Sequence, residues 1–75
     1  MPSPPNDYRP LLGRKLSLRY RLHDEPAHPF SEVVGVLASV AAGDDDRETL
    51  SILTRRGETV HVPAAEIEAA RVFPA

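Results

Sequence analysis

Apolar and polar residues alternate along several short stretches of this chain, and the clearest case is a pair of runs at residues 50–53 and 59–62. Alternation with a period of two is typical of a strand that buries one face. The sequence RRGE joins the two runs, and its Gly57 can adopt the positive φ that a tight turn requires. The pattern therefore predicts a β-hairpin.

The two stretches before the hairpin also favour strands. Residues 14–22 place Leu16, Leu18, Tyr20 and Leu22 on one face and charged residues on the other. The run 31–42 is apolar and rich in valine, and its length fits either a buried helix or a strand. Gly35 and the neighbouring valines favour a long strand, which we expect to kink or bulge and change face near Gly35.

After the hairpin, Pro63 suits the first position of a helical turn. A helix as far as Arg71 fits the alanines and glutamates that follow, but a helix of fewer than about three turns is marginal on its own. We therefore expect one short 3₁₀ or α turn and then a brief closing strand over residues 70–73.

Five short strands with a helical turn before the last predict an all-β, SH3-like small barrel over residues 12–74. An oligonucleotide-binding barrel also has five strands, but it usually needs a longer chain and a helix where RRGE stands here. Residues 1–11, rich in proline, are expected to form a disordered tail that includes Tyr8. The predicted core contains Leu16, Leu18, Leu37, Val40, Leu50, Ile52, Val60, Val62, Ile67 and Val72, and Tyr20 and Phe73 are also expected inside.

Composition narrows the class of protein. The 75 residues suffice for one small domain with a thin core, and they include no cysteine, so no disulfide or thiolate metal site exists. No apolar run approaches the ~20 residues of a membrane helix, and the N-terminus has no apolar signal-peptide core. We expect a cytoplasmic protein that does not contact membranes.

The segments LGRKLSLRYRL, VVGVL and LSILTRRGETVHVPAAEIEAARVFP, with the acidic turn before the last of them, resemble the SH3-like N-terminal module of actinobacterial GNAT-type N-acetyltransferases, often labelled histone acetyltransferases. The resemblance covers about Leu12 to Pro74. In that family the module precedes a separate catalytic domain, which is not in these 75 residues. The resemblance therefore implies an accessory, non-enzymatic module that positions a catalytic domain or a protein partner.

Candidate chemistry is sparse. His23, Asp24, Glu25 and His28 have side chains of the right type for a metal, but two prolines and the spacing match no standard site, so a solvated loop is expected. The run Asp44–Asp46 lacks the glycine and distal glutamate of a calcium loop. Ser31, Ser39 and Ser51 have no sequence signal for a base beside them. We expect no catalytic residue, metal or cofactor, and His61 is expected on the outer face of the hairpin.

Two surface features suggest binding. Six of the nine Lys and Arg residues form one stripe if the hairpin tip leans toward the first strand: Arg14, Lys15, Arg19, Arg21, Arg55 and Arg56. Such a stripe would follow the phosphates of a nucleic acid, the alternative function, although no exposed aromatics are expected among these cations. The simpler interpretation is that they pair with Glu32, Glu48, Glu58 and the acidic turn. Val36 and Leu53 should face outward and, if adjacent, form a docking patch.

Overall fold

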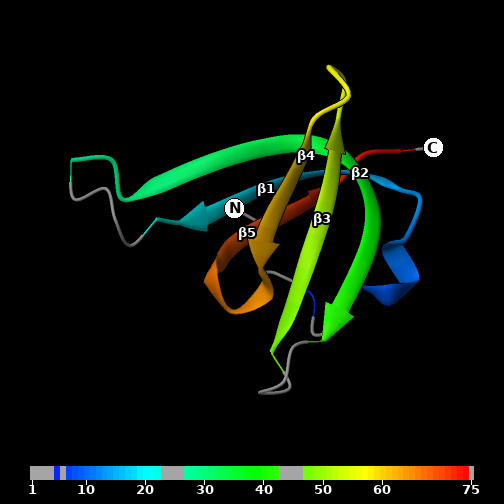
Figure 1. Ribbon diagram of the computed structural model, residues 1–75, viewed down its shortest axis with the longest axis horizontal. Helices are drawn as coiled ribbons and strands as arrows, with labels where there is room; N and C mark the ends of the chain where they lie inside the picture. The colour runs from blue at the N-terminus through cyan, green and yellow to red at the C-terminus, as the bar shows by residue number, and fades with distance from the viewer. Residues whose placement is uncertain (1–4, 6, 23–26, 43–46, 75) are drawn as a thin grey trace.

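The computed structural model describes residues 5, 7–22, 27–42 and 47–74. In chain order its elements are η1 (Arg9–Leu11), β1 (Lys15–Arg21), β2 (Phe30–Ala42), β3 (Glu48–Thr54), β4 (Thr59–Pro63), η2 (Ala64–Glu66) and β5 (Ile67–Val72). The five strands are antiparallel and form one sheet in the order β4-β3-β2-β1-β5. The sheet curls around a single core as a small barrel, which confirms the predicted fold class (Figure 1).

The β3–β4 hairpin follows the predicted phase. Leu50 pairs with Val62 and Ile52 with Val60 in the strand register. Gly57 has φ 85° and closes the turn, whose hydrogen bonds include Thr54 N–H to the Glu58 carbonyl at 2.8 Å. A glycine at positive φ and alternating apolar residues thus place one face of the hairpin inside the barrel.

The end of the chain also follows the preferred prediction. Pro63 precedes the 3₁₀ turn η2, and β5 begins directly after it at Ile67. The closing strand is longer than expected because the helical turn takes only three residues.

The bend of β2 has a different origin from the one predicted at Gly35. Val33, Gly35 and Leu37 all face inward, so the strand keeps its phase through the glycine. The irregularity lies between Leu37 and Ser39, where the register with β3 shifts. At Gly35 an added Cβ would meet the Leu53 carbonyl oxygen and would lie 2.8 Å from Ile52 Cγ2. Glycine therefore serves close approach of β3 to β2 and not a change of face.

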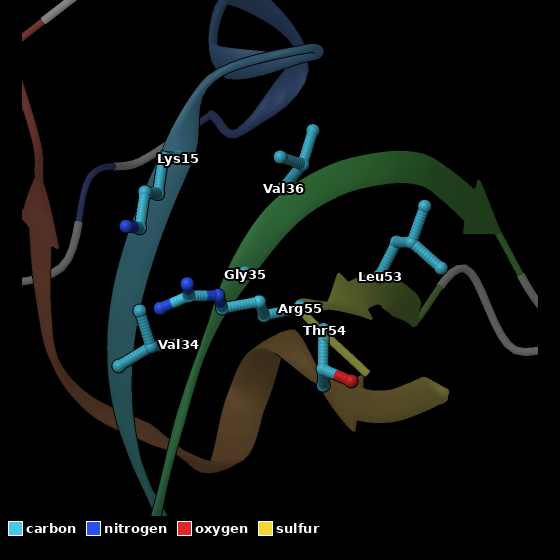
Figure 2. A pocket seen from close by; sticks show the side chains of 7 residues that line it. All are labelled: Lys15, Val34, Gly35, Val36, Leu53, Thr54 and Arg55. Carbon is cyan, nitrogen blue, oxygen red and sulfur yellow. The ribbon is translucent and has the colours of Figure 1, made fainter. Parts of the chain in front are cut away.

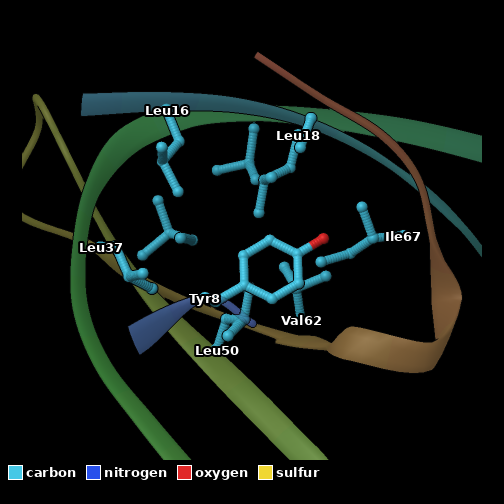
Figure 3. Packing of buried hydrophobic residues seen from close by; sticks show 10 residues of the cluster. Tyr8, Leu16, Leu18, Leu37, Leu50, Val62 and Ile67 are labelled. Atoms are coloured by element: carbon cyan, nitrogen blue, oxygen red, sulfur yellow. The ribbon is translucent and has the colours of Figure 1, made fainter. Parts of the chain in front are cut away.

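The core matches the prediction in most positions (Figure 3). Six predicted side chains are completely buried: Leu16, Leu18, Leu37, Leu50, Ile52 and Val62. Ile67 is also buried, and Val40, Val60 and Tyr20 are half-buried and pack against this cluster. Val33 and Ala70 belong to the core but were not predicted.

Two predicted core residues lie outside it. Val72 is the last residue of β5 and is 38% exposed, although it pairs with the buried Leu16. Phe73 is half-buried after the strand, where its N–H donates to the Lys15 carbonyl at 3.0 Å. Val72 lies at the end of β5, where the inward phase no longer buries its side chain. Phe73, one position later, places its ring beside the exposed Lys15 and Arg71.

Tyr8, expected in the tail, is instead a core residue. Its side chain is only 4% exposed and lies among Leu50, Val62 and Ile67 (Figure 3). The turn η1 holds it there, and Gly13, with φ 82°, then directs the chain into β1. Its hydroxyl has no hydrogen-bond partner among the described residues, and burial raises the pKa of Tyr8 to about 12.

Candidate binding groove on the outer face

The predicted patch residues Val36 and Leu53 lie opposite each other in the β2–β3 register. They are 38% and 43% exposed. Val34, two residues earlier on the same face of β2, is 45% exposed and was not predicted. Its signal in the sequence was the alternation of β2 up to Leu37, which the assumed change of face at Gly35 obscured.

These three side chains line a groove of about 500 Å³ together with Lys15, Gly35, Thr54 and Arg55 (Figure 2). Lys15 enters from β1, where it pairs with Val36, and Arg55 enters from the tip of the hairpin. Figure 2 shows Arg55 extending over Gly35 toward Val34 and Lys15, while Leu53 and Val36 lie on the other side. An apolar floor and two cations therefore converge on one site.

The predicted basic stripe separates into different environments. Arg14 lies just before β1, and its guanidinium donates to the Phe73 carbonyl at 3.1 Å, partly buried. Arg55 leans toward Lys15, as the stripe required, whereas Arg56 does not line the groove. Neither Arg55 nor Arg56 has an ion pair with any described residue. Both arginines of the hairpin tip are thus exposed, but only Arg55 lines the groove.

The cations of β1 contact aromatic rings, which the sequence did not lead us to expect. Arg19 and Arg21 lie over the ring of Phe30, at 4.6 and 5.6 Å from its centroid. Lys15 and Arg71 lie over Phe73, at 5.2 and 5.8 Å. Strand pairing brings Phe30 and Phe73 beside the cations of β1, whereas Arg71 lies two residues before Phe73 along the chain.

The ion pairs differ from those expected. Arg21 pairs with Glu68 at 3.0 Å, and Glu48 pairs with Arg9 at 2.7 Å. Glu32 and Glu58 form no ion pair with the described residues. The carboxylates expected to neutralise the stripe therefore leave Lys15 and Arg55 without an ion-pair partner in the described part of the chain.

The other candidate residues form no assembled centre in the described regions. No three His, Asp or Glu side chains there lie close enough to hold a metal ion, and His28 is exposed. His23, Asp24 and Glu25 lie outside the described residues, as does the run Asp44–Asp46. His61 is exposed on the hairpin as predicted, and its Nδ1 lies 3.1 Å from the Ser51 hydroxyl across the strands. Ser51 is the only described hydrogen-bond partner of this ring, so nothing there orients the histidine as a base.

No helix in residues 5, 7–22, 27–42 or 47–74 is long and apolar enough to cross a membrane. Comparison with known families shows that residues 10–71 match the family described as the Rv0428c N-terminal Sm-like domain. Searches of curated proteins and of solved structures give no significant match.

Proposed function

The chain belongs to the Rv0428c N-terminal Sm-like domain family, and from this premise we propose that it is a non-catalytic accessory module that docks onto a protein partner. The groove formed by Val34, Val36 and Leu53 carries the proposal. Adjacent apolar side chains exposed on one face of a small domain mark a surface that gains stability when another protein covers it. The description of the family places the domain at the N-terminus of its named member, which supports a role beside further protein sequence.

The partner we propose is a catalytic domain of the GNAT N-acetyltransferase type. The support is the resemblance of LGRKLSLRYRL and TRRGETVHVPAAEIEAA to the N-terminal modules of those enzymes. In this function the barrel supplies a rigid surface, and the catalytic domain supplies the chemistry. Both would act in the cytoplasm.

The test adds the catalytic domain of such an acetyltransferase to the isotope-labelled chain and follows its amide shifts. We expect shifts at Val34, Val36 and Leu53. Leu53→Asp should abolish them, because a carboxylate in an apolar contact loses its hydration. Ala41→Asp is the matched control, since Ala41 is an exposed apolar residue on the neighbouring strand β2 but lies outside the groove. If Leu53→Asp folds and binds as the wild type does, the groove is not the docking surface.

The second candidate function is nucleic-acid binding, and one observation favours it. The cations of β1 lie beside two aromatic rings, Phe30 and Phe73, and single-stranded nucleic acids stack on rings of this kind. Binding should then fall steeply with salt because phosphate contacts release counterions. A titration with mixed RNA and duplex DNA at two salt concentrations tests this function. The absence of amide shifts at low salt eliminates it.

A further inference from the structure

The groove adjoins an open edge of the sheet. β2 pairs with β1 from Phe30 to Val36, but its pairing with β3 begins only at Gly35. Among the described residues, positions 30–34 therefore have a strand on one side only. Figure 1 shows this first half of β2 continuing beside β1, away from the hairpin. An unpaired strand edge is the place where an extended segment of another chain can add as a further strand.

The side chains beside this edge suit an apolar residue of such a segment. Val34 and Val36 project from β2 on the outer face, and Leu53 lies across from Val36. Residues at every second position of a strand face the same way, so an added strand presents its side chains to this groove with a period of two. One apolar side chain of the added strand would then enter the groove, and a residue two positions away would face the same side of the sheet beside it.

The charge on one side of the groove indicates what that neighbouring residue is. Lys15 and Arg55 line the groove without ion-pair partners among the described residues, while the whole chain has a formal net charge of -2. Glu32 is also on this face, but it lies opposite Arg19 on β1. A second copy of the chain apposed by the same face would bring a second pair of these cations into the interface and no added negative charge from the groove residues. Charge complementarity therefore favours a partner that is acidic at this contact.

We propose that the groove binds an extended acidic segment of a partner protein, in which Asp or Glu residues lie on one side of an apolar residue, the first of them two positions away from it. The segment adds as a strand along residues 30–34. Lys15 and Arg55 pair with the carboxylates, and Val34, Val36 and Leu53 contact the apolar side chain. This inference rests on the proposed docking function and specifies the chemistry of the partner.

The experiment selects random decapeptides displayed on phage against the immobilised 75-residue chain. We expect enrichment of peptides with acidic residues on one side of an apolar residue, one of them two positions away from it. The most enriched peptide is then synthesised with a fluorophore, and its binding is followed by anisotropy. Arg55→Ala should weaken binding about tenfold, as expected for loss of one charge-assisted hydrogen bond. Arg56→Ala should leave it unchanged, because Arg56 is exposed on the same turn but outside the groove.

Three results would overturn the inference: enrichment of basic peptides, no enrichment at all, or equal effects of Arg55→Ala and Arg56→Ala. Amide shifts of the wild-type chain with the peptide do not depend on whether the variants fold. These shifts must map to residues 30–36 and 53–55. The outcomes also separate this inference from the function proposed above. If the acetyltransferase domain shifts amide signals on another face, the docking function is supported and the binding of an acidic segment in the groove is not. If acidic peptides bind but the acetyltransferase domain does not, the binding of an acidic segment in the groove is supported and the acetyltransferase partner is not.

Discussion

Two parts of the barrel differ in whether the chain itself buries their apolar side chains. At one, Tyr8 from the N-terminal segment packs among Leu50, Val62 and Ile67 and is only 4% exposed. At the other, where β2 diverges from β3, no described residue covers the groove and Leu53 stays 43% exposed. In the first part a residue of the chain itself fills the space between the strands. In the second part the apolar side chains stay exposed.

The surroundings of the two parts explain the difference. The segment that carries Tyr8 is held by the turn η1, by the hydrogen bond from the Gly13 N–H to the Leu37 carbonyl at 2.9 Å, and by the ion pair between Arg9 and Glu48. The groove adjoins an open strand edge and is lined by the cations Lys15 and Arg55. The first part therefore serves stability, and the second suits a partner. This contrast predicts that substitutions at Tyr8 change unfolding and substitutions at Leu53 change binding.

The largest expected effect is that of Tyr8→Ala. Removal of a buried aromatic ring leaves a cavity in the core, which should lower the free energy of unfolding by about 3 kcal/mol. For a domain this small, that is a large part of the total. Urea denaturation measures the change.

The matched comparison is Leu53→Ala, which removes an exposed apolar side chain. The free energy of unfolding should change by less than about 0.5 kcal/mol, since a surface substitution leaves no cavity. If both variants lose equal stability, the N-terminal segment does not close the barrel in the way described, and the contrast between the two parts fails.

The next effect is that of Gly35→Ala at the floor of the groove. A methyl group there would meet the backbone of Leu53 and the side chain of Ile52, and backbone atoms cannot move aside easily. Overpacking of this kind should cost about 2 kcal/mol of unfolding free energy. Ser39→Ala is the control on the same strand, because Ser39 is exposed. Equal stability of the two variants would mean that β3 does not approach β2 so closely.

Local patterns explain how much of the fold could be predicted. The phases of β1 and of the hairpin depend on a period of two that any window of the sequence displays, and they are right. The bend of β2 depends on a register shift between Leu37 and Ser39, which no residue type signals. The prolines of the N-terminal segment led to the prediction of a disordered tail. The burial of Tyr8 could not be predicted, because it depends on packing against residues distant in sequence.

The candidate site likewise has features that local patterns predict and features that depend on the folded structure. Val36 and Leu53 followed from strand phase, so their exposure could be predicted. The approach of Arg55 to Lys15 depends on the curvature of the sheet, which brings the hairpin tip toward β1. The cation–ring contacts of Arg19 with Phe30 likewise come from pairing between strands and not from spacing along the chain.

A smaller and opposite effect is expected for Tyr8→Phe. The buried hydroxyl has no partner in the described part of the chain, so its removal should raise the free energy of unfolding by about 1 kcal/mol. The pKa of Tyr8 is also raised from 10.0 to about 12 by burial. Above pH 10 the unfolded chain loses this proton while the folded chain keeps it.

Stability of the wild type should therefore fall as the pH rises from 10 to 12, and this contribution should be missing in Tyr8→Phe. Urea midpoints of both proteins below and within this window measure it. All other ionisable groups are the same in both proteins, so their effects cancel in the difference. Parallel pH profiles would show that the hydroxyl is hydrated in the folded state.

The smallest effect is expected for Arg9→Ala, which removes an outer contact of the segment that carries Tyr8. Arg9 pairs with Glu48 at 2.7 Å, but its side chain is 56% exposed and it also lies 3.4 Å from Asp7. Exposed ion pairs contribute little, so the loss should be about 0.5 kcal/mol and should shrink at high salt. Arg56→Ala, an exposed arginine without an ion pair to any described residue, should cost nothing in the same urea titration. A larger, salt-independent loss for Arg9→Ala would mean that charge, and not the aromatic ring, anchors the segment.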